Sequence, residues 1–264
     1  MYRGFNLTIT DEDFEDLKKN EMFRFRTFLR KLFNKVVEDG LQKYLIDKER
    51  LDGDVMMEDW FPNVDADIFI SHSHHDLDKA TALMGYFQKF GLSSFVDSYV
   101  WKHSDKLLKL LDNKLCYNED RNTYDYGKRN QTTSHVHMML ATALTQMMDK
   151  CECLFFLNTP NSANPKSDIS KKVYTHSPWL FHEIATFEYI RKKRRISKYA
   201  AEGNTNFSLD EAEMPRILHS LKMENLVPLT YDDLKEWYRE SEDEKDKLAV
   251  LYNKFPLSLG TNLE

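Results

Sequence analysis

Residues 65–97, DADIFISHSHHDLDKATALMGYFQKFGLSSFVD, constrain the fold more than any other stretch of the chain. A short apolar run, Ile68 to Ile70, breaks at small polar residues and gives way to a helical pattern that Gly91 stops. A second apolar run then ends at Asp97. Strand, loop, helix and strand in this order are typical of the βαβ unit of a parallel sheet, so we predict a fold of the α/β class.

The carboxyl edge of that sheet is the expected place for a ligand, because parallel α/β sheets bind ligands beyond the ends of their strands. Two polar segments leave strands there, residues 71–76 and residues 97–101. The sequence therefore predicts a site at the edge that the βαβ unit defines.

Composition narrows the classes of partner. The 264 residues suit one large α/β domain with an extension, and 41% hydrophobic residues suffice for a core. A net charge of −6 gives no electrostatic reason to expect a nucleic-acid partner. No apolar run approaches the ~18 residues that span a bilayer, so we expect no membrane partner.

The three cysteines, Cys116, Cys151 and Cys153, are odd in number and form no CxxC pair, which favours reduced structural thiols. The first residues, MYRGFNLTITDEDFED, lack the apolar core of a signal peptide. Both observations favour a cytoplasmic location.

Residues 1–64 are predicted to form an N-terminal helical extension. Within them, residues 10–40 carry apolar positions at helical spacing, and Thr10 or Asp11 is suited to cap the helix. Two interpretations stay open: a helix packed on the domain with a solvated basic face, or a docking surface for another protomer.

Local patterns predict the rest of the main domain, residues 65–264. The elements expected beyond the βαβ unit are a loop at 98–101, a polar inserted loop near 117–131, a helix at 134–150 capped by Ser134, a strand at 154–157, an edge strand at 226–229 and a closing C-terminal helix at 232–252. Residues 197–218 show no clear fourth strand.

One acidic residue stands out on a predicted helix that Ser177 and Pro178 begin. Glu183 lies beside the apolar stripe that contains Leu180 and Ile184, not opposite it. A carboxylate in that position is costly unless it borders a cleft or has partners. The structural alternative is a helix-face acid paired with a nearby cation.

Three segments together resemble a Toll/interleukin-1 receptor (TIR) domain. DIFISHSHHD at 67–76 resembles the first strand and loop of that family, and GLSSFVDSYVW at 91–101 resembles the second strand and its loop. LFFLNTPNS followed by SPWLFHE resembles the third strand and the helix with the serine-tryptophan-glutamate pattern, which ends here at Glu183. The resemblance covers about residues 65–229 and implies a flavodoxin-like parallel sheet flanked by helices.

Two departures from the family pattern bear on function. The insertion near residues 117–131 is extra, and the loop after Asp97 lacks the proline-glycine signature of receptor and adaptor members. The resemblance therefore points to bacterial TIR enzymes, in particular to the sensor subunit of an anti-phage system of the Thoeris type.

That resemblance implies cleavage of the nicotinamide–ribose bond of NAD, which is then the substrate, with no cofactor required. Glu183 matches the family's catalytic glutamate. Nicotinamide in NAD is already a cationic leaving group, so one carboxylate suffices to stabilise the oxocarbenium-like ribose. The product is linear, cyclic or base-exchanged ADP-ribose, and the sequence leaves these three open.

The family also implies self-association on activation and a separate effector protein that the small-molecule product activates. Further substrate contacts are expected from Ser71, His72, Ser73, Asp97, Trp101 and Trp179. For the residues at 71–73 the alternative is loop polarity, and for the tryptophans it is core packing.

Two other functions remain as alternatives. His72, His74 and Asp76 follow the HxHxD pattern of metal-dependent hydrolases and would suit a metal-activated water. The TIR fold could instead serve only as a non-catalytic self-assembly module, since fold does not fix function.

Overall fold

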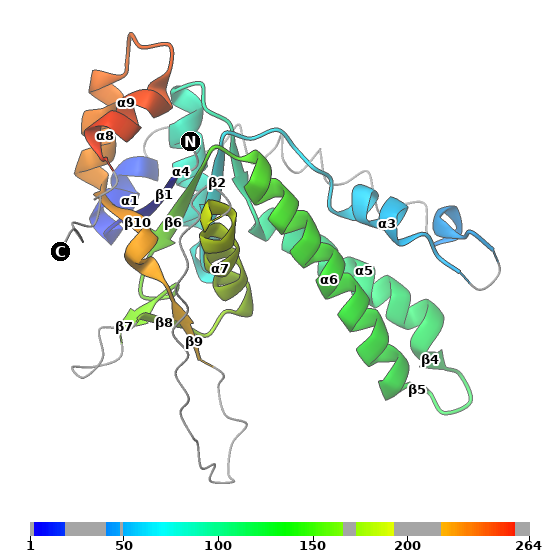
Figure 1. Cartoon of the computed structure of the whole chain (residues 1–264). Coiled ribbons are helices and arrows are strands. Elements are labelled where there is room, and N and C mark those ends of the chain that lie inside the picture. Colours follow the sequence, from blue (N-terminus) through cyan, green and yellow to red (C-terminus); the bar gives the residue numbers. More distant parts are fainter. Residues whose placement is uncertain (1–2, 19–40, 48–49, 166–172, 193–217, 257–264) are drawn as a thin grey trace.

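The computed structural model of the chain describes residues 3–18, 41–47, 50–165, 173–192 and 218–256. A five-stranded parallel sheet forms its centre, flanked by helices (Figure 1). The strands lie in the order β10 (Leu226–Thr230), β1 (Arg3–Thr8), β6 (Cys153–Asn158), β2 (Ile68–Ser71) and β3 (Ser94–Val96). The predicted α/β class and its parallel sheet are confirmed.

The βαβ unit also forms as predicted. Strand β2 leads through a short 3-10 helix, η3 (His74–Asp76), into α4 (Leu77–Lys89), and β3 follows. Gly91 ends the helical segment with a φ of 76°, a left-handed conformation that favours glycine. The two strands pair in parallel register, Phe69 opposite Phe95.

Strand β1 is the largest departure from the predicted organisation. It lies inside the sheet and pairs in parallel with both β6 and β10. Counting from β2, the order matches the 2-1-3-4-5 arrangement of flavodoxin-like sheets, but the fourth position is filled by this N-terminal strand. The prediction that residues 1–64 form a helical extension outside the domain is therefore wrong for residues 3–8.

The helix predicted over residues 10–40 is described only at its start, α1 (Asp11–Lys18), and its remainder lies outside the described residues. Thr10 caps it as expected: Asp13 N donates to Thr10 Oγ1, and Thr10 N donates to Asp13 Oδ2. A further helix, α3 (Gly53–Trp60), lies within the range predicted as a helical extension, and Asp52 caps it.

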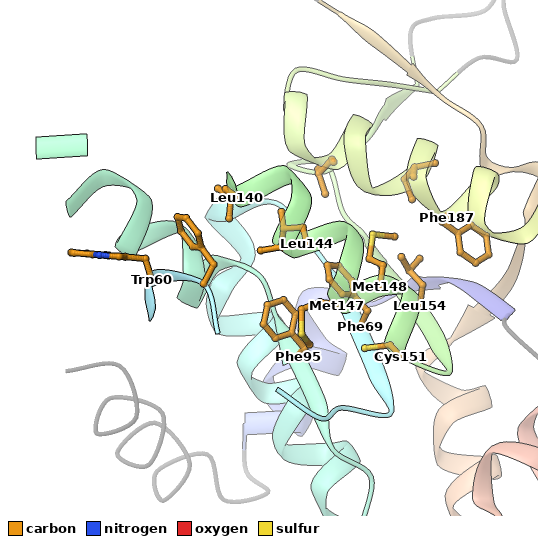
Figure 2. Close-up of a cluster of buried hydrophobic side chains, with 14 of the residues drawn as sticks. Trp60, Phe69, Phe95, Leu140, Leu144, Met147, Met148, Cys151, Leu154 and Phe187 are labelled. Carbon is orange, nitrogen blue, oxygen red and sulfur yellow. The ribbon is translucent and has the colours of Figure 1, made fainter. Parts of the chain in front are cut away.

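Helices on the two faces of the sheet enclose separate apolar cores, because successive strand residues point to opposite faces. On one face Phe69 and Leu154 pack with Met147, Met148 and Phe187 (Figure 2). On the other, Phe5, Ile70 and Phe155 pack among residues of α1, α4, α8 (Tyr231–Glu240) and α9 (Lys247–Lys254). The closing helix expected at 232–252 is thus two helices.

A helical hairpin projects from the sheet (Figure 1). It consists of α5 (Ser98–Leu111), the π-helical turn η4 (Asp112–Cys116), strands β4 (Tyr117–Asn118) and β5 (Thr123–Tyr124), and α6 (Tyr126–Lys150). The loop predicted at 98–101 is therefore wrong, since α5 starts immediately after Asp97. The polar loop predicted near 117–131 is a short β-hairpin up to Tyr124, and the prediction is wrong from Tyr126, where α6 starts. Asp125, not Ser134, caps α6 by accepting from Lys128 N.

A further helix and a small antiparallel sheet complete the described fold. Helix α7 (Pro178–Lys192) packs against α6, and strand β8 (Val173–Thr175) pairs antiparallel with β7 (Asn164–Pro165) and β9 (His219–Leu221). Two short 3-10 turns, η2 (Gln42–Tyr44) and η5 (Met223–Asn225), complete the list of helical elements in the described ranges. No helix within those ranges has the length and apolarity required to cross a bilayer.

Candidate functional site

Glu183 lies at the carboxyl edge of the sheet and is completely buried, with 0% of its surface exposed. Helix α7 brings it there, and Ser177 fixes the start of that helix by accepting from Leu180 N at 3.2 Å. The hydroxyl of Ser71, the last residue of β2, donates to Glu183 Oε2 at 2.5 Å. The buried acid therefore has a hydrogen-bond partner, and that partner is a neutral hydroxyl, not the cation of the structural alternative.

A second set of buried contacts lies beside the first. His72 Nδ1 is 2.9 Å from Asp97 Oδ1, and His72 Nε2 is 2.7 Å from Ser98 Oγ. All three residues are buried. They come from the ends of β2 and β3, so the two polar segments predicted to meet at this edge do so.

The surroundings of His72 fix which ring nitrogen carries hydrogen. The Ile70 carbonyl oxygen lies 3.4 Å from Nδ1, on the same side as Asp97. Both neighbours of Nδ1 only accept, so Nδ1 carries a hydrogen. Burial lowers the pKa of His72, but the charge and hydrogen bond of Asp97, the Ile70 carbonyl and the charge of Asp76 outweigh it, and the pKa is raised above 6.5.

The pKa of Glu183 is well above its ordinary value. Burial is the largest cause, and the nearby Asp97 charge and a hydrogen bond with Asp97 add to it. The hydrogen bond from Ser71 lowers the pKa but does not offset the other effects. Burial and the neighbouring Asp97 charge therefore favour the neutral form of the Glu183 carboxyl in this conformation.

We call these five residues the edge cluster: Ser71, His72, Asp97, Ser98 and Glu183. Four of them were predicted site residues. Ser98 was missed because a loop was expected after Asp97, whereas a helix begins there and turns the hydroxyl toward His72. The signal that could have identified Ser98 was its position directly after Asp97, the acid predicted at the end of the strand.

Ser73, another predicted site residue, belongs to a neighbouring group. Its backbone N–H donates to Ser162 Oγ at 3.3 Å. Close by, Thr159 Oγ1 and Asn161 Nδ2 donate to the two carboxylate oxygens of Asp76, at 2.5 and 3.0 Å. These contacts tie the loop after β2 to the loop after β6, which is a structural role.

Trp179 contacts two histidines, one on α6 and one on its own helix. The Trp179 ring lies edge-on to His137 of α6, at 5.6 Å between centroids, and near His182. Its half-buried position belongs to the α6–α7 contact. The backbone of Trp101 falls in α5, and its side chain lies outside the described part of the structure.

The HxHxD residues do not converge as metal ligands. Both ring nitrogens of His72 face Asp97 and Ser98, Asp76 is held by Thr159 and Asn161, and His74 is exposed. Among the described residues, no three His, Cys, Asp or Glu side chains are placed to hold a metal ion. The geometry gives no support to the metal-dependent hydrolase interpretation.

A cavity of about 270 Å³ lies elsewhere, on the projecting hairpin. Its lining consists of Asp105, Leu108, Lys109, Asp112, Asn113, Tyr124, Arg129 and Thr133, and does not include the edge cluster. Glu183 itself has no exposed surface, so its carboxyl is closed to solvent in this conformation. The three thiols, Cys116, Cys151 and Cys153, are free and buried, as predicted.

Comparison of the chain with protein-family models, with curated proteins and with solved structures gave no match.

Proposed function

We propose that this protein cleaves the nicotinamide–ribose bond of NAD and that Glu183 is its catalytic residue. The observation that carries the proposal is a fully buried glutamate at the carboxyl edge of a parallel sheet, hydrogen-bonded to the strand-end Ser71. A buried acid with a raised pKa at a ligand-binding edge is typical of functional sites. The resemblance of three segments to TIR enzymes adds the reaction.

The chemistry needs only one carboxylate. The C1′–N bond breaks with both electrons passing to the nicotinamide nitrogen, which loses its positive charge, and positive charge develops on the ribose. An ionised Glu183 would stabilise that charge in surroundings from which water is excluded. Attack by water would give ADP-ribose and a proton, while attack by the adenine or by another base would give a cyclic or base-exchanged product.

This reaction requires two changes at the site. Glu183 must become accessible, because it is completely buried, and it must ionise, because burial and the nearby Asp97 raise its pKa and favour the neutral form. A cationic ligand beside a carboxyl group favours the ionised form, so NAD binding itself would promote the second change. Self-association on activation would be a means of opening the site.

In a cell, we place the protein in bacterial anti-phage defence of the Thoeris type, in the cytoplasm. Its ADP-ribose-derived product would activate a separate effector protein. This placement rests on the TIR resemblance and on the departures from receptor and adaptor members.

The test is release of nicotinamide from NAD by the purified chain, at low and at high protein concentration. Glu183→Gln should lower the rate by about 100-fold or more. The matched control is Glu188→Gln on the same helix, where the native acid pairs with Lys222 Nζ at 3.2 Å. Release that survives Glu183→Gln would refute the site, and mass spectrometry of the products would identify the second nucleophile.

One observation favours a second candidate, a non-catalytic self-assembly module. Complete burial suits a residue that only holds α7 against the sheet edge. A chain that assembles normally and releases no nicotinamide at any concentration would favour this alternative.

A further inference from the structure

We propose that Asp97 is the internal acceptor of the Glu183 proton and that His72 positions Asp97 for this role. The inference rests on the proposed function, because the transfer prepares Glu183 for a cationic substrate. It gives Asp97 and His72 roles in the reaction that differ from core packing and from contact with the substrate.

The first step locates the proton. Glu183 Oε2 accepts from Ser71, whereas Oε1 is buried and meets no hydrogen-bond donor among the described residues. The other side chain that interacts with this carboxyl is Asp97, which has only acceptor oxygens when ionised. A proton between two buried carboxyl groups that act on each other removes the repulsion of two negative charges, so we place it on Glu183 Oε1, the oxygen that meets no donor.

The second step explains why Asp97 is the ionised member of the pair. His72 Nδ1 carries a hydrogen and lies 2.9 Å from Asp97 Oδ1, so the ring stabilises a negative charge there. Glu183 has the neutral Ser71 hydroxyl instead. The other charge that acts on His72 is the Asp76 carboxylate of η3. In the resting state the edge cluster therefore holds its negative charge on Asp97.

The third step is the transfer itself. When the positively charged nicotinamide ring of NAD approaches Glu183, the Oε1–H bond breaks and an O–H bond to Asp97 forms. The number of protons and the net charge of the cluster do not change, and nothing is oxidised or reduced. No ion has to cross the apolar surroundings, which would be costly. His72 keeps its contacts to Ser98 and to the Ile70 carbonyl throughout.

Infrared difference spectroscopy on the full chain tests the transfer directly. Protein with ¹³C-labelled aspartate is mixed with NAD, and the carbonyl bands of protonated Glu and Asp side chains are compared. We expect loss of a Glu band together with gain of a ¹³C-shifted Asp band. NADH, whose nicotinamide ring is uncharged, is the matched control and should produce neither change. Loss of the Glu band without the Asp band would overturn the proposal.

A second measurement needs no ligand. Glu183→Gln should remove the protonated Glu band, and Glu188→Gln should keep it. In Asp97→Asn the midpoint of that band should fall by about one pH unit or more, because the neighbouring charge is gone. An unchanged midpoint would refute the pairing. If Asp97→Asn does not fold, pH titration of the labelled wild type decides: Asp and Glu bands that titrate independently would refute it.

Two outcomes distinguish a failure of the proton-transfer inference from a failure of the proposed NAD cleavage. A chain that releases no nicotinamide but shows the midpoint shift would fail as an NAD-cleaving enzyme while keeping the Glu183–Asp97 pair. A chain that releases nicotinamide with the same kcat and pH profile after Asp97→Asn would keep the function and lose the proton acceptor.

Discussion

Gly4 lies directly against the ring of Phe187: a Cβ atom on residue 4 would stand 2.4 Å from Phe187 Cζ. The close approach joins β1, in the sheet, to α7, the helix that carries Glu183. Leu226 of β10 is as near, with its Cδ2 atom 2.5 Å from the same position. No side chain fits at residue 4 unless these neighbours move.

Gly4→Val should therefore destabilise the protein by about 1–3 kcal/mol, the range for overfilling a packed core. Urea unfolding measures it. Gly85→Ala is the matched control, because Gly85 lies in α4 with nothing within 4 Å of the added carbon. That change should be neutral or stabilising by about 0.5–1 kcal/mol. Equal effects at both positions would contradict the packing of α7 on β1.

The raised pKa of Glu183 gives stability a definite dependence on pH. Above its ordinary value of 4.5 the unfolded chain releases this proton, while the folded chain keeps it. The folded state binds more protons, so this group's contribution to stability falls as pH rises, until the raised pKa is passed.

Glu183→Gln removes this loss, because the amide is neutral and of similar shape. We expect the variant's free energy of unfolding to gain on that of the wild type as pH increases from 5 to 9. Urea titrations at several pH values measure the difference. Glu188→Gln should show no such gain, and parallel curves for Glu183→Gln and the wild type would mean that Glu183 is ionised.

The His72–Asp97 contact predicts a loss of stability in the same direction, which begins at a higher pH than the loss from Glu183. The pKa of His72 is raised in the folded protein. The stabilisation from a charged His72 is therefore complete below about 6.5, the pKa in the unfolded chain, and is lost as pH rises through the folded pKa. His72→Asn should cost about 3–5 kcal/mol at pH 6, since it leaves a buried acid without its cation. The difference in free energy of unfolding between His72→Asn and the wild type should become smaller at alkaline pH.

Thermal or urea unfolding of His75→Asn provides the comparison, because His75 is exposed and lies in η3, three residues after His72. Its effect should stay within about 0.5 kcal/mol. A large loss in that variant, or no loss in His72→Asn, would contradict the buried ion pair.

The start of α6 gives a local test. Asp125→Ala removes the side chain that accepts from Lys128 N and should destabilise the helix end by about 1 kcal/mol. Hydrogen exchange should quicken in the first turn of α6, and nicotinamide release should be unaffected. Asp120→Ala, on the exposed turn of the same hairpin, should leave exchange in α6 as it is. Equal exchange in the two variants would contradict the cap.

Short apolar runs, which can be recognised within a few residues of sequence, predicted four of the five strands of the central sheet. Strands β2, β3, β6 and β10 are short apolar runs between turn residues, and each forms within a residue or two of its expected place. Strand β1, RGFNLT, carries Gly4 and Asn6 in a short segment, and only its pairing with β6 and β10 makes it a strand.

The edge cluster was predictable in part for the same reason. The ends of β2 and β3 had to meet at one edge, so Ser71, His72 and Asp97 came together as expected. The complete burial of Glu183 and the role of Ser98 depend on how α5 and α7 pack, which no single helix pattern contains.

The position of β1 bears on the order of events during synthesis. This strand is synthesised before the rest of the sheet, yet its neighbour β6 follows 150 residues later, since Arg3 pairs with Cys153, and β10 follows later still. At about 5–20 residues per second, residues 3–8 wait on the order of ten seconds for a partner. Until then the βαβ unit of β2, α4 and β3 can pair within itself, while an apolar strand edge stays open for chaperones to cover.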